Sequence, residues 1–124
     1  GQPATIRACG STAIADNRFD LSASQLPPGQ FGYFLASETS DFVQNPGGSQ
    51  GNLCLGGTIG RFTSQVRTSG PNGAFGITVD LTNMPPPAQQ IVLPGEVWNF
   101  QAWFRDVNPQ TTSNFTDAVS VVFR

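Results

Sequence analysis

The 124-residue chain has no histidine and no lysine, and charged residues make up only 11% of it, against roughly 25% in an ordinary domain. Without histidine a Ser-His-Asp triad is impossible, and the usual general base at neutral pH is missing. Glycoside hydrolysis by two carboxylates would have to draw on Glu38, Glu96 and six aspartates. Glu96 follows Pro94-Gly95 at the start of an expected strand, where a carboxylate commonly accepts turn amides. The composition therefore predicts a protein that is not an enzyme.

Positive charge is equally scarce, because all six basic residues are arginines and the net charge is −2. Binding to nucleic acid depends on a basic surface, and binding to an anionic membrane depends on a polybasic segment. No apolar run approaches the length of a transmembrane helix. We therefore expect no nucleic-acid partner and no membrane insertion. Residues 1–4 lack the charged and apolar regions of a signal peptide, so the chain is interpreted as a mature or excised domain.

Only two cysteines occur, Cys9 and Cys54. Two thiols without histidine cannot form an ordinary structural zinc site, and a cysteine nucleophile would lack a base. The prediction is a Cys9–Cys54 disulfide in a secreted protein, which would stabilise the fold by about 4 kcal/mol in the chain-entropy model. Two buried free thiols are the alternative.

Apolar and polar residues alternate along much of the chain, whereas helical periodicity is almost absent. The clearest cases are 75–82 and 19–24, where every second side chain is apolar, as in a half-buried strand. Further strands are expected near 3–8, 30–37, 57–68, 96–106 and 117–123, separated by turns rich in proline and glycine. These spacings predict a single domain over residues 1–124, an all-β antiparallel sandwich of about seven to eight strands with one disulfide. The polar stretch 38–56 is expected to be a surface loop.

Oxygen-bearing side chains gather in the predicted loop 106–117, which holds Asp106, Asn108, Asn114 and Asp117. Carboxylates and amides are ligands for calcium, although this spacing is not that of an EF-hand. The alternative is that the aspartates form Asx turns or pair with Arg105. Calcium is the only cofactor that the sequence suggests.

The stretch WNFQAWFRD, residues 98–106, holds four aromatic side chains. As a strand it would place Trp98, Phe100, Ala102 and Phe104 on one apolar face, which we expect in the core. The opposite face would carry the candidate ligand-binding residues, which are Asn99, Gln101, Trp103 and Arg105. Aromatic planes stack on sugar rings while amides and arginine bind hydroxyl groups, so this face suits a polysaccharide or a cell-surface glycan. The alternative is that Trp103 lies beneath a loop and the amides bond to backbone.

Three segments, 51–62, 94–106 and 113–121, together with the turn at 26–32, resemble a poorly characterised β-rich domain. That domain recurs at the C-terminal ends of large secreted proteins of planctomycetes and myxobacteria. The resemblance spans nearly the whole chain and implies a bacterial, exported accessory domain at the cell surface or outside the cell. It implies no active-site residues. The leading hypothesis is thus a non-catalytic polysaccharide-binding module. The alternative is a structural subunit of a surface, matrix or filament, or a sorting domain, that acts through protein contacts and self-association.

Overall fold

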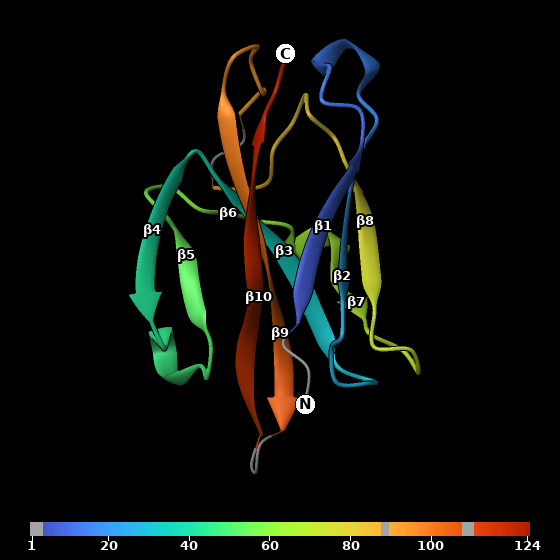
Figure 1. The fold of residues 1–124 in the computed structure, drawn as a ribbon, viewed down its shortest axis with the longest axis vertical. Helices are drawn as coiled ribbons and strands as arrows, with labels where there is room; N and C mark the ends of the chain where they lie inside the picture. The colour runs from blue at the N-terminus through green and yellow to red at the C-terminus, as the bar shows by residue number, and fades with distance from the viewer. Residues whose placement is uncertain (1–3, 88–89, 108–110) are drawn as a thin grey trace.

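A computed structural model describes residues 4–87, 90–107 and 111–124 (Figure 1). In this part of the chain, the regular secondary structure consists of β-strands and three short 3-10 turns. The strands are β1 (Thr5–Gly10), β2 (Phe19–Ser24), β3 (Phe31–Ser37), β4 (Thr39–Gln44), β5 (Asn52–Gly56), β6 (Gly60–Arg61), β7 (Arg67–Thr68), β8 (Phe75–Val79), β9 (Val97–Val107) and β10 (Thr111–Val122). The 3-10 turns are η1 (Ile14–Asp16), η2 (Pro46–Gly48) and η3 (Thr63–Gln65). The predicted all-β class is confirmed.

Two antiparallel sheets form the body of the molecule. The smaller sheet has the strand order β1-β2-β8, and the larger has the order β10-β9-β3-β6, with β7 also paired to β3. Strands β4 and β5 form a separate two-stranded hairpin. Figure 1 shows this hairpin on the side of the larger sheet that faces away from β1, β2 and β8. The arrangement is sandwich-like, with a third layer over part of the larger sheet.

The core lies between the two sheets and follows from the alternation of their strands. In β2, Phe19, Leu21 and Ala23 are each 1% exposed. The predicted inner face of β9 is buried in full, with Trp98, Phe100, Ala102 and Phe104 at most 3% exposed. Burying a large apolar side chain contributes about 1.5–3 kcal/mol, so these two strands account for much of the driving force for folding.

Two stretches differ from their predicted form. Residues 38–56 are not a loop but the hairpin β4–β5, whose turn contains η2. Every residue of β4 is exposed, so neither of its faces had to be apolar and the alternation that marks a strand is absent. Residues 57–68 do not form one strand, because η3 turns the chain between β6 and β7. These two short strands pair with opposite ends of β3.

The predicted Cys9–Cys54 disulfide is wrong. Cys9 is exposed on β1 in the smaller sheet, and Cys54 is half-buried on β5 in the hairpin, which lies beyond the larger sheet. Both thiols are free. A disulfide needs Cα atoms about 4.4–6.8 Å apart, and here the larger sheet lies between the two cysteines. The inference of secretion from a disulfide therefore loses its basis.

Strand β10 begins well before the predicted residue 117 and carries a bulge between Phe115 and Ala118. At this bulge, the hydroxyl of Thr116 accepts a hydrogen bond from the backbone N–H of Ala102 at 3.0 Å. A bulge interrupts the regular ladder between strands. The Thr116 side chain thus replaces the backbone acceptor that the bulge displaces, and β10 stays paired with β9 along its length.

Candidate functional site

The outward face of β9 carries all four predicted ligand-binding residues, but the hairpin β4–β5 divides them into two pairs. Asn99 and Gln101 are 5% and 0% exposed. Trp103 is half-buried and Arg105 is exposed. The structure therefore brings the four residues onto one face, as expected, and leaves only the second pair open to solvent.

The buried pair uses its amides to hold neighbouring strands together. Asn99 donates to the carbonyl oxygen of Ser37 at 3.2 Å and accepts a hydrogen bond from the hydroxyl of Ser120. The Gln101 carbonyl accepts the N–H of Cys54 at 2.9 Å. The Gln101 amide nitrogen donates to two further backbone oxygens, those of Asn52 at 2.8 Å and Thr116 at 2.7 Å. Buried polar groups require such partners, so these two amides act in the fold and not at the surface.

In the second pair, Trp103 belongs to an aromatic row that crosses three strands, and Arg105 contacts it. Trp103 on β9 pairs in register with Tyr33 on β3 and with Phe115 on β10, so the three side chains project from the same face. The Trp103 and Tyr33 ring centroids are 5.2 Å apart, with the planes tilted by 37°. The Arg105 guanidinium carbon lies 5.2 Å from the Trp103 ring centroid, within the range of a cation–π contact.

A groove of about 240 Å³ runs along this aromatic row. Its floor is the outer face of the larger sheet, and the hairpin turn and the β5–β6 segment form its walls. The residues that line it are Tyr33, Leu35, Pro46, Gly47, Leu53, Ile59, Arg61, Trp103 and Phe115. Phe31, two residues before Tyr33 on β3, is 62% exposed and lies on the same side of the strand. We call this site the aromatic groove.

No acidic side chain is among the residues that line the aromatic groove. Arg61 lies on β6, opposite Leu35 of β3, and is exposed. Within the described residues its guanidinium makes no hydrogen bond or ion pair with another side chain. The aromatic groove therefore combines apolar rings with a cation that has its hydrogen-bond donors available.

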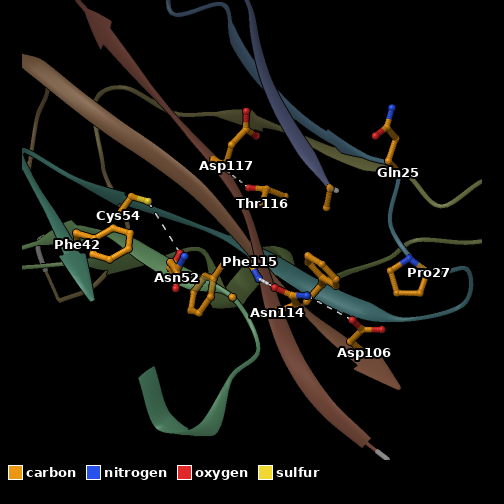
Figure 2. Close-up of a pocket in the computed structure, with 13 residues that line it drawn as sticks. Gln25, Pro27, Phe42, Asn52, Cys54, Asp106, Asn114, Phe115, Thr116 and Asp117 are labelled. Atoms are coloured by element: carbon orange, nitrogen blue, oxygen red, sulfur yellow. Dashed lines mark hydrogen bonds between the residues drawn. The ribbon is translucent and has the colours of Figure 1, made fainter. Parts of the chain in front are cut away.

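A second depression, of about 360 Å³, lies over the edge of β10 and shares Phe115 with the aromatic groove (Figure 2). Figure 2 shows Phe42, Asn52 and Cys54 on one side of β10 and Gln25 and Pro27 on the other. It is larger than the aromatic groove, and carboxylate and amide groups also line it.

Three of the four predicted calcium ligands, Asp106, Asn114 and Asp117, line this second depression. Asn114 donates to a carboxylate oxygen of Asp106 at 3.5 Å (Figure 2). Asp117 instead accepts the backbone N–H of Ile6 at 2.8 Å, which ties β10 to β1. Asn108 lies outside the described residues. Among the residues that are described, no three His, Cys, Asp or Glu side chains lie close enough to hold a metal ion.

The two glutamates of the chain meet at the other end of β9. The hydrogen bond that Glu38 shares with Glu96 raises the pKa of Glu38, and desolvation and repulsion between the two carboxyls add to this shift. Burial raises the pKa of Glu96, but hydrogen bonds, the first of them from the backbone N–H of Leu93 at 2.7 Å, bring it below its ordinary value. Glu96 thus accepts a turn amide, as its position predicted. Carboxyls that share a hydrogen bond are closer than the roughly 5–9.5 Å of glycosidase pairs.

Of the nine residues that line the aromatic groove, the sequence singled out Trp103 alone as a site residue. It did not point to the two other rings, Tyr33 and Phe115, or to the cation Arg61. Tyr33 lies in a strand that is apolar on both sides, and its pattern resembles that of a central strand. Phe115 and Arg61 lie on strands whose register with β9 and β3 cannot be read from local pattern. Only strand pairing places these side chains next to Trp103.

No protein-family model matches the chain, and no curated protein sequence matches it. Among the described residues, no helix is long and apolar enough to cross a membrane.

Proposed function

We propose that this protein is a non-catalytic binding module that holds a polysaccharide in the aromatic groove. The observation that carries the proposal is the row Tyr33–Trp103–Phe115, in register across three strands on the outer face of a sheet. Stacking on a sugar ring requires an aromatic plane that solvent can reach. The ring must also be held rigidly enough that little conformational entropy is lost on binding. A row on three paired strands meets both requirements.

The size of the aromatic groove favours a chain over a small molecule. Sites that enclose a small ligand usually have volumes of roughly 300–1,000 Å³, whereas this groove measures about 240 Å³. It is large enough to seat part of an extended polymer whose remainder stays in solvent. The exposed ring of Phe31, 62% accessible, extends the apolar surface beyond the end of the groove.

The proposal revises which residues contact the ligand. Trp103 and Arg105 remain from the predicted set, and Tyr33, Arg61 and Phe115 join them. Asn99 and Gln101 support the floor of the site from behind. An exported location, at the cell surface or outside the cell, is part of the proposal. It rests on the weakly charged, lysine-free composition and on the resemblance to the domains of secreted bacterial proteins.

Titration calorimetry and affinity electrophoresis across a panel of polysaccharides test the proposal. We expect at least one glycan to bind, and we expect Trp103→Ala and Tyr33→Ala to abolish that binding. Phe42→Ala is the matched control, because Phe42 is 64% exposed and borders the second depression instead. Circular dichroism checks that each variant is folded. The absence of binding to every glycan, or normal binding by folded Trp103→Ala, would overturn the proposal.

A second measurement keeps the test decisive if Trp103→Ala does not fold. In the unmodified protein, the indole N–H resonance of Trp103 should shift on titration with the bound glycan, and that of Trp98 should not. Trp98 is 1% exposed and donates to Glu96, so it reports on the core. Shifts confined to the second depression would contradict the assignment of the site.

Strands β1 and β10 carry the observation that favours a second candidate, a structural subunit that self-associates. They are edge strands of different sheets and are joined at two points. At one end, Asp117 N–H donates to the carbonyl of Ala4 at 3.4 Å; at the other, Arg124 N–H donates to the carbonyl of Thr12 at 3.0 Å. The two strands therefore run side by side in the same direction.

Between these two joints the strands enclose a gap of about 330 Å³. The hydrogen bonds at the joints show which backbone groups point into the gap. On both strands these are the N–H and C=O groups of even-numbered residues, among them Ala8 and Gly10 of β1 and Ser120 and Val122 of β10. In the described residues, no strand ladder pairs these groups across the gap. Free strand edges invite pairing with another chain. Light scattering over a range of protein concentrations tests this candidate, and a monomer at all concentrations would exclude it.

A further inference from the structure

We infer that the aromatic groove selects polysaccharides that carry an anionic group, either a uronic-acid carboxylate or a sulfate. This inference rests on the proposed function and adds the chemical class of the ligand. It starts from charge, since the protein as a whole has a net charge of −2, yet no acidic residue lines the aromatic groove. The groove is thus a local positive site on a weakly negative protein.

Strand register places one guanidinium on each side of the aromatic row. Tyr33 pairs with Trp103. Two residues further along β3 and on the same face, Leu35 pairs with Arg61 on β6. Arg105 lies two residues after Trp103 on the same face of β9. Because β9 runs antiparallel to β3, Arg105 and Arg61 are displaced from the aromatic row in opposite directions. A sugar chain that follows the aromatic row across the strands therefore has Arg105 on one side of its path and Arg61 on the other.

The two arginines are suited to bind anions in different ways. The guanidinium of Arg105 lies over the Trp103 ring at 5.2 Å, and this contact holds the cation next to the stacking surface before a ligand arrives. Arg61 lines the groove directly and makes no side-chain hydrogen bond within the described residues. A free guanidinium forms paired hydrogen bonds with a planar carboxylate or with sulfate oxygens.

A neutral glycan would leave the positive charge of these arginines uncompensated. Covering Arg61 with a neutral chain removes water from its donors without supplying an opposite charge, which costs binding free energy. Hydroxyl groups accept hydrogen bonds from arginine, but a carboxylate or sulfate also supplies an opposite charge and accepts two parallel bonds from one guanidinium. The groove therefore discriminates between neutral and acidic chains of the same sugar backbone.

The carboxylates nearby set the direction of the bound chain. Asp106 and Asp117 both border the second depression, which adjoins the aromatic groove at Phe115. An anionic polymer that continued over β10 would approach these two carboxylates and be repelled. We therefore expect the chain to leave the groove toward β6 and Arg61, so that Phe115 marks one end of the bound segment.

Binding of matched acidic and neutral polymers tests the inference. Calorimetry with polygalacturonate against neutral galactan probes the carboxylate, and dextran sulfate against dextran probes the sulfate. We expect one acidic polymer of these pairs to bind at least about tenfold more tightly than its neutral counterpart, a ratio worth about 1.4 kcal/mol. Its affinity should fall as salt is raised. Which pair shows the difference identifies the anionic group.

Arg61→Gln and Arg105→Gln should each weaken binding of the acidic polymer by about tenfold and leave binding of a neutral polymer unchanged. Arg7→Gln is the matched control, because Arg7 is exposed on β1 in the other sheet. If both arginine variants bind as the unmodified protein does, the inference is wrong. Single-stranded oligothymidylate that binds as tightly as the acidic glycan would also overturn it, since the groove would then recognise polyanions in general.

The outcomes separate this inference from the proposed function. Equal binding of acidic and neutral polymers, lost in Trp103→Ala, would refute the charge selection and leave the polysaccharide module intact. No binding to any glycan in the four-polymer set or the wider panel would refute both. Tight acidic binding that survives Trp103→Ala but is lost in Arg61→Gln would keep the charge recognition and remove the stacking role of the aromatic row.

Discussion

The side-chain carbonyl of Gln101 on β9 accepts the backbone N–H of Cys54 on β5 at 2.9 Å. The same side chain donates to the carbonyl oxygens of Asn52 and Thr116, so one buried amide joins the hairpin β4–β5 to two strands of the larger sheet. Where this hairpin rests on the sheet, the surface is closed. Where it ends, Trp103 and the aromatic groove begin.

Replacing Gln101 with alanine should destabilise the protein by about 2–4 kcal/mol, because it leaves one N–H and two carbonyl groups without a partner in a buried place. Urea unfolding followed by circular dichroism measures this change. Gln44→Ala is the control, since Gln44 is exposed on β4, and it should change the free energy of unfolding by less than about 0.5 kcal/mol. Similar values for the two variants would contradict the role assigned to Gln101.

The two tryptophans should differ in their access to solvent. Trp98 is 1% exposed, and Trp103 is half-buried next to Tyr33. In Trp98→Phe the remaining fluorescence comes from Trp103, and acrylamide should quench it readily. In Trp103→Phe the remaining Trp98 should resist quenching until the protein unfolds. Equally weak quenching of the two variants in the folded state would mean that the ring of Trp103 does not meet solvent, and the aromatic groove would then be closed.

Neither cysteine should contribute to stability through a covalent bond. Both thiols are free, so Cys9→Ser, which alters an exposed side chain, should leave the urea midpoint unchanged, and a reducing agent should have no effect on the unmodified protein. A thiol reagent should label Cys9 quickly in the folded protein and both cysteines after unfolding, without prior reduction. A lower midpoint under reducing conditions would show that a disulfide forms after all.

Stability should depend on pH through the pair Glu38 and Glu96. The pKa of Glu38 is raised in the folded protein, so folding favours its protonated form. The stabilisation associated with that proton is present at low pH and is lost as the pH rises through the folded pKa. At pH 7 the two carboxylates repel each other. Glu38→Gln keeps a donor toward Glu96 and removes one charge.

Glu38→Gln should therefore be slightly more stable than the unmodified protein at neutral pH, by no more than about 0.5 kcal/mol because Glu38 is exposed to solvent. The difference should vanish at about pH 3, where glutamate is protonated. Glu96→Gln should instead destabilise at neutral pH, because the pKa of Glu96 is lowered in the folded protein and folding therefore favours its ionised form, which a neutral amide cannot replace. Thermal unfolding measured across this pH range distinguishes the two variants, and a stabilising effect of both would contradict the pairing.

Alternation along individual strands was sufficient to predict much of the fold. The inner face of β9 and the inner residues of β2 and β8 are buried as expected, because each of these strands has one face in the core and one outside it. The same rule failed for β4. Its residues are all exposed, so no burial pattern was imposed on them, and the hairpin was interpreted as a loop.

The candidate site was predicted in part. The sequence placed Asn99, Gln101, Trp103 and Arg105 on one face of one strand, because side chains alternate with a period of two. It contained no signal for what covers that face. The hairpin buries the first two residues, and strand pairing brings Tyr33, Phe115 and Arg61 beside the last two.

The sequence by itself therefore determined the class of the fold, the buried side of its main strands and the absence of histidine chemistry, since these follow from composition and from local periodicity. Only the tertiary structure decided that Cys9 and Cys54 lie on opposite sides of the larger sheet. Only the structure decided that Trp103 lies in a groove between two arginines. Both results depend on contacts between segments far apart in the chain, and local periodicity carries no information about which strands become neighbours.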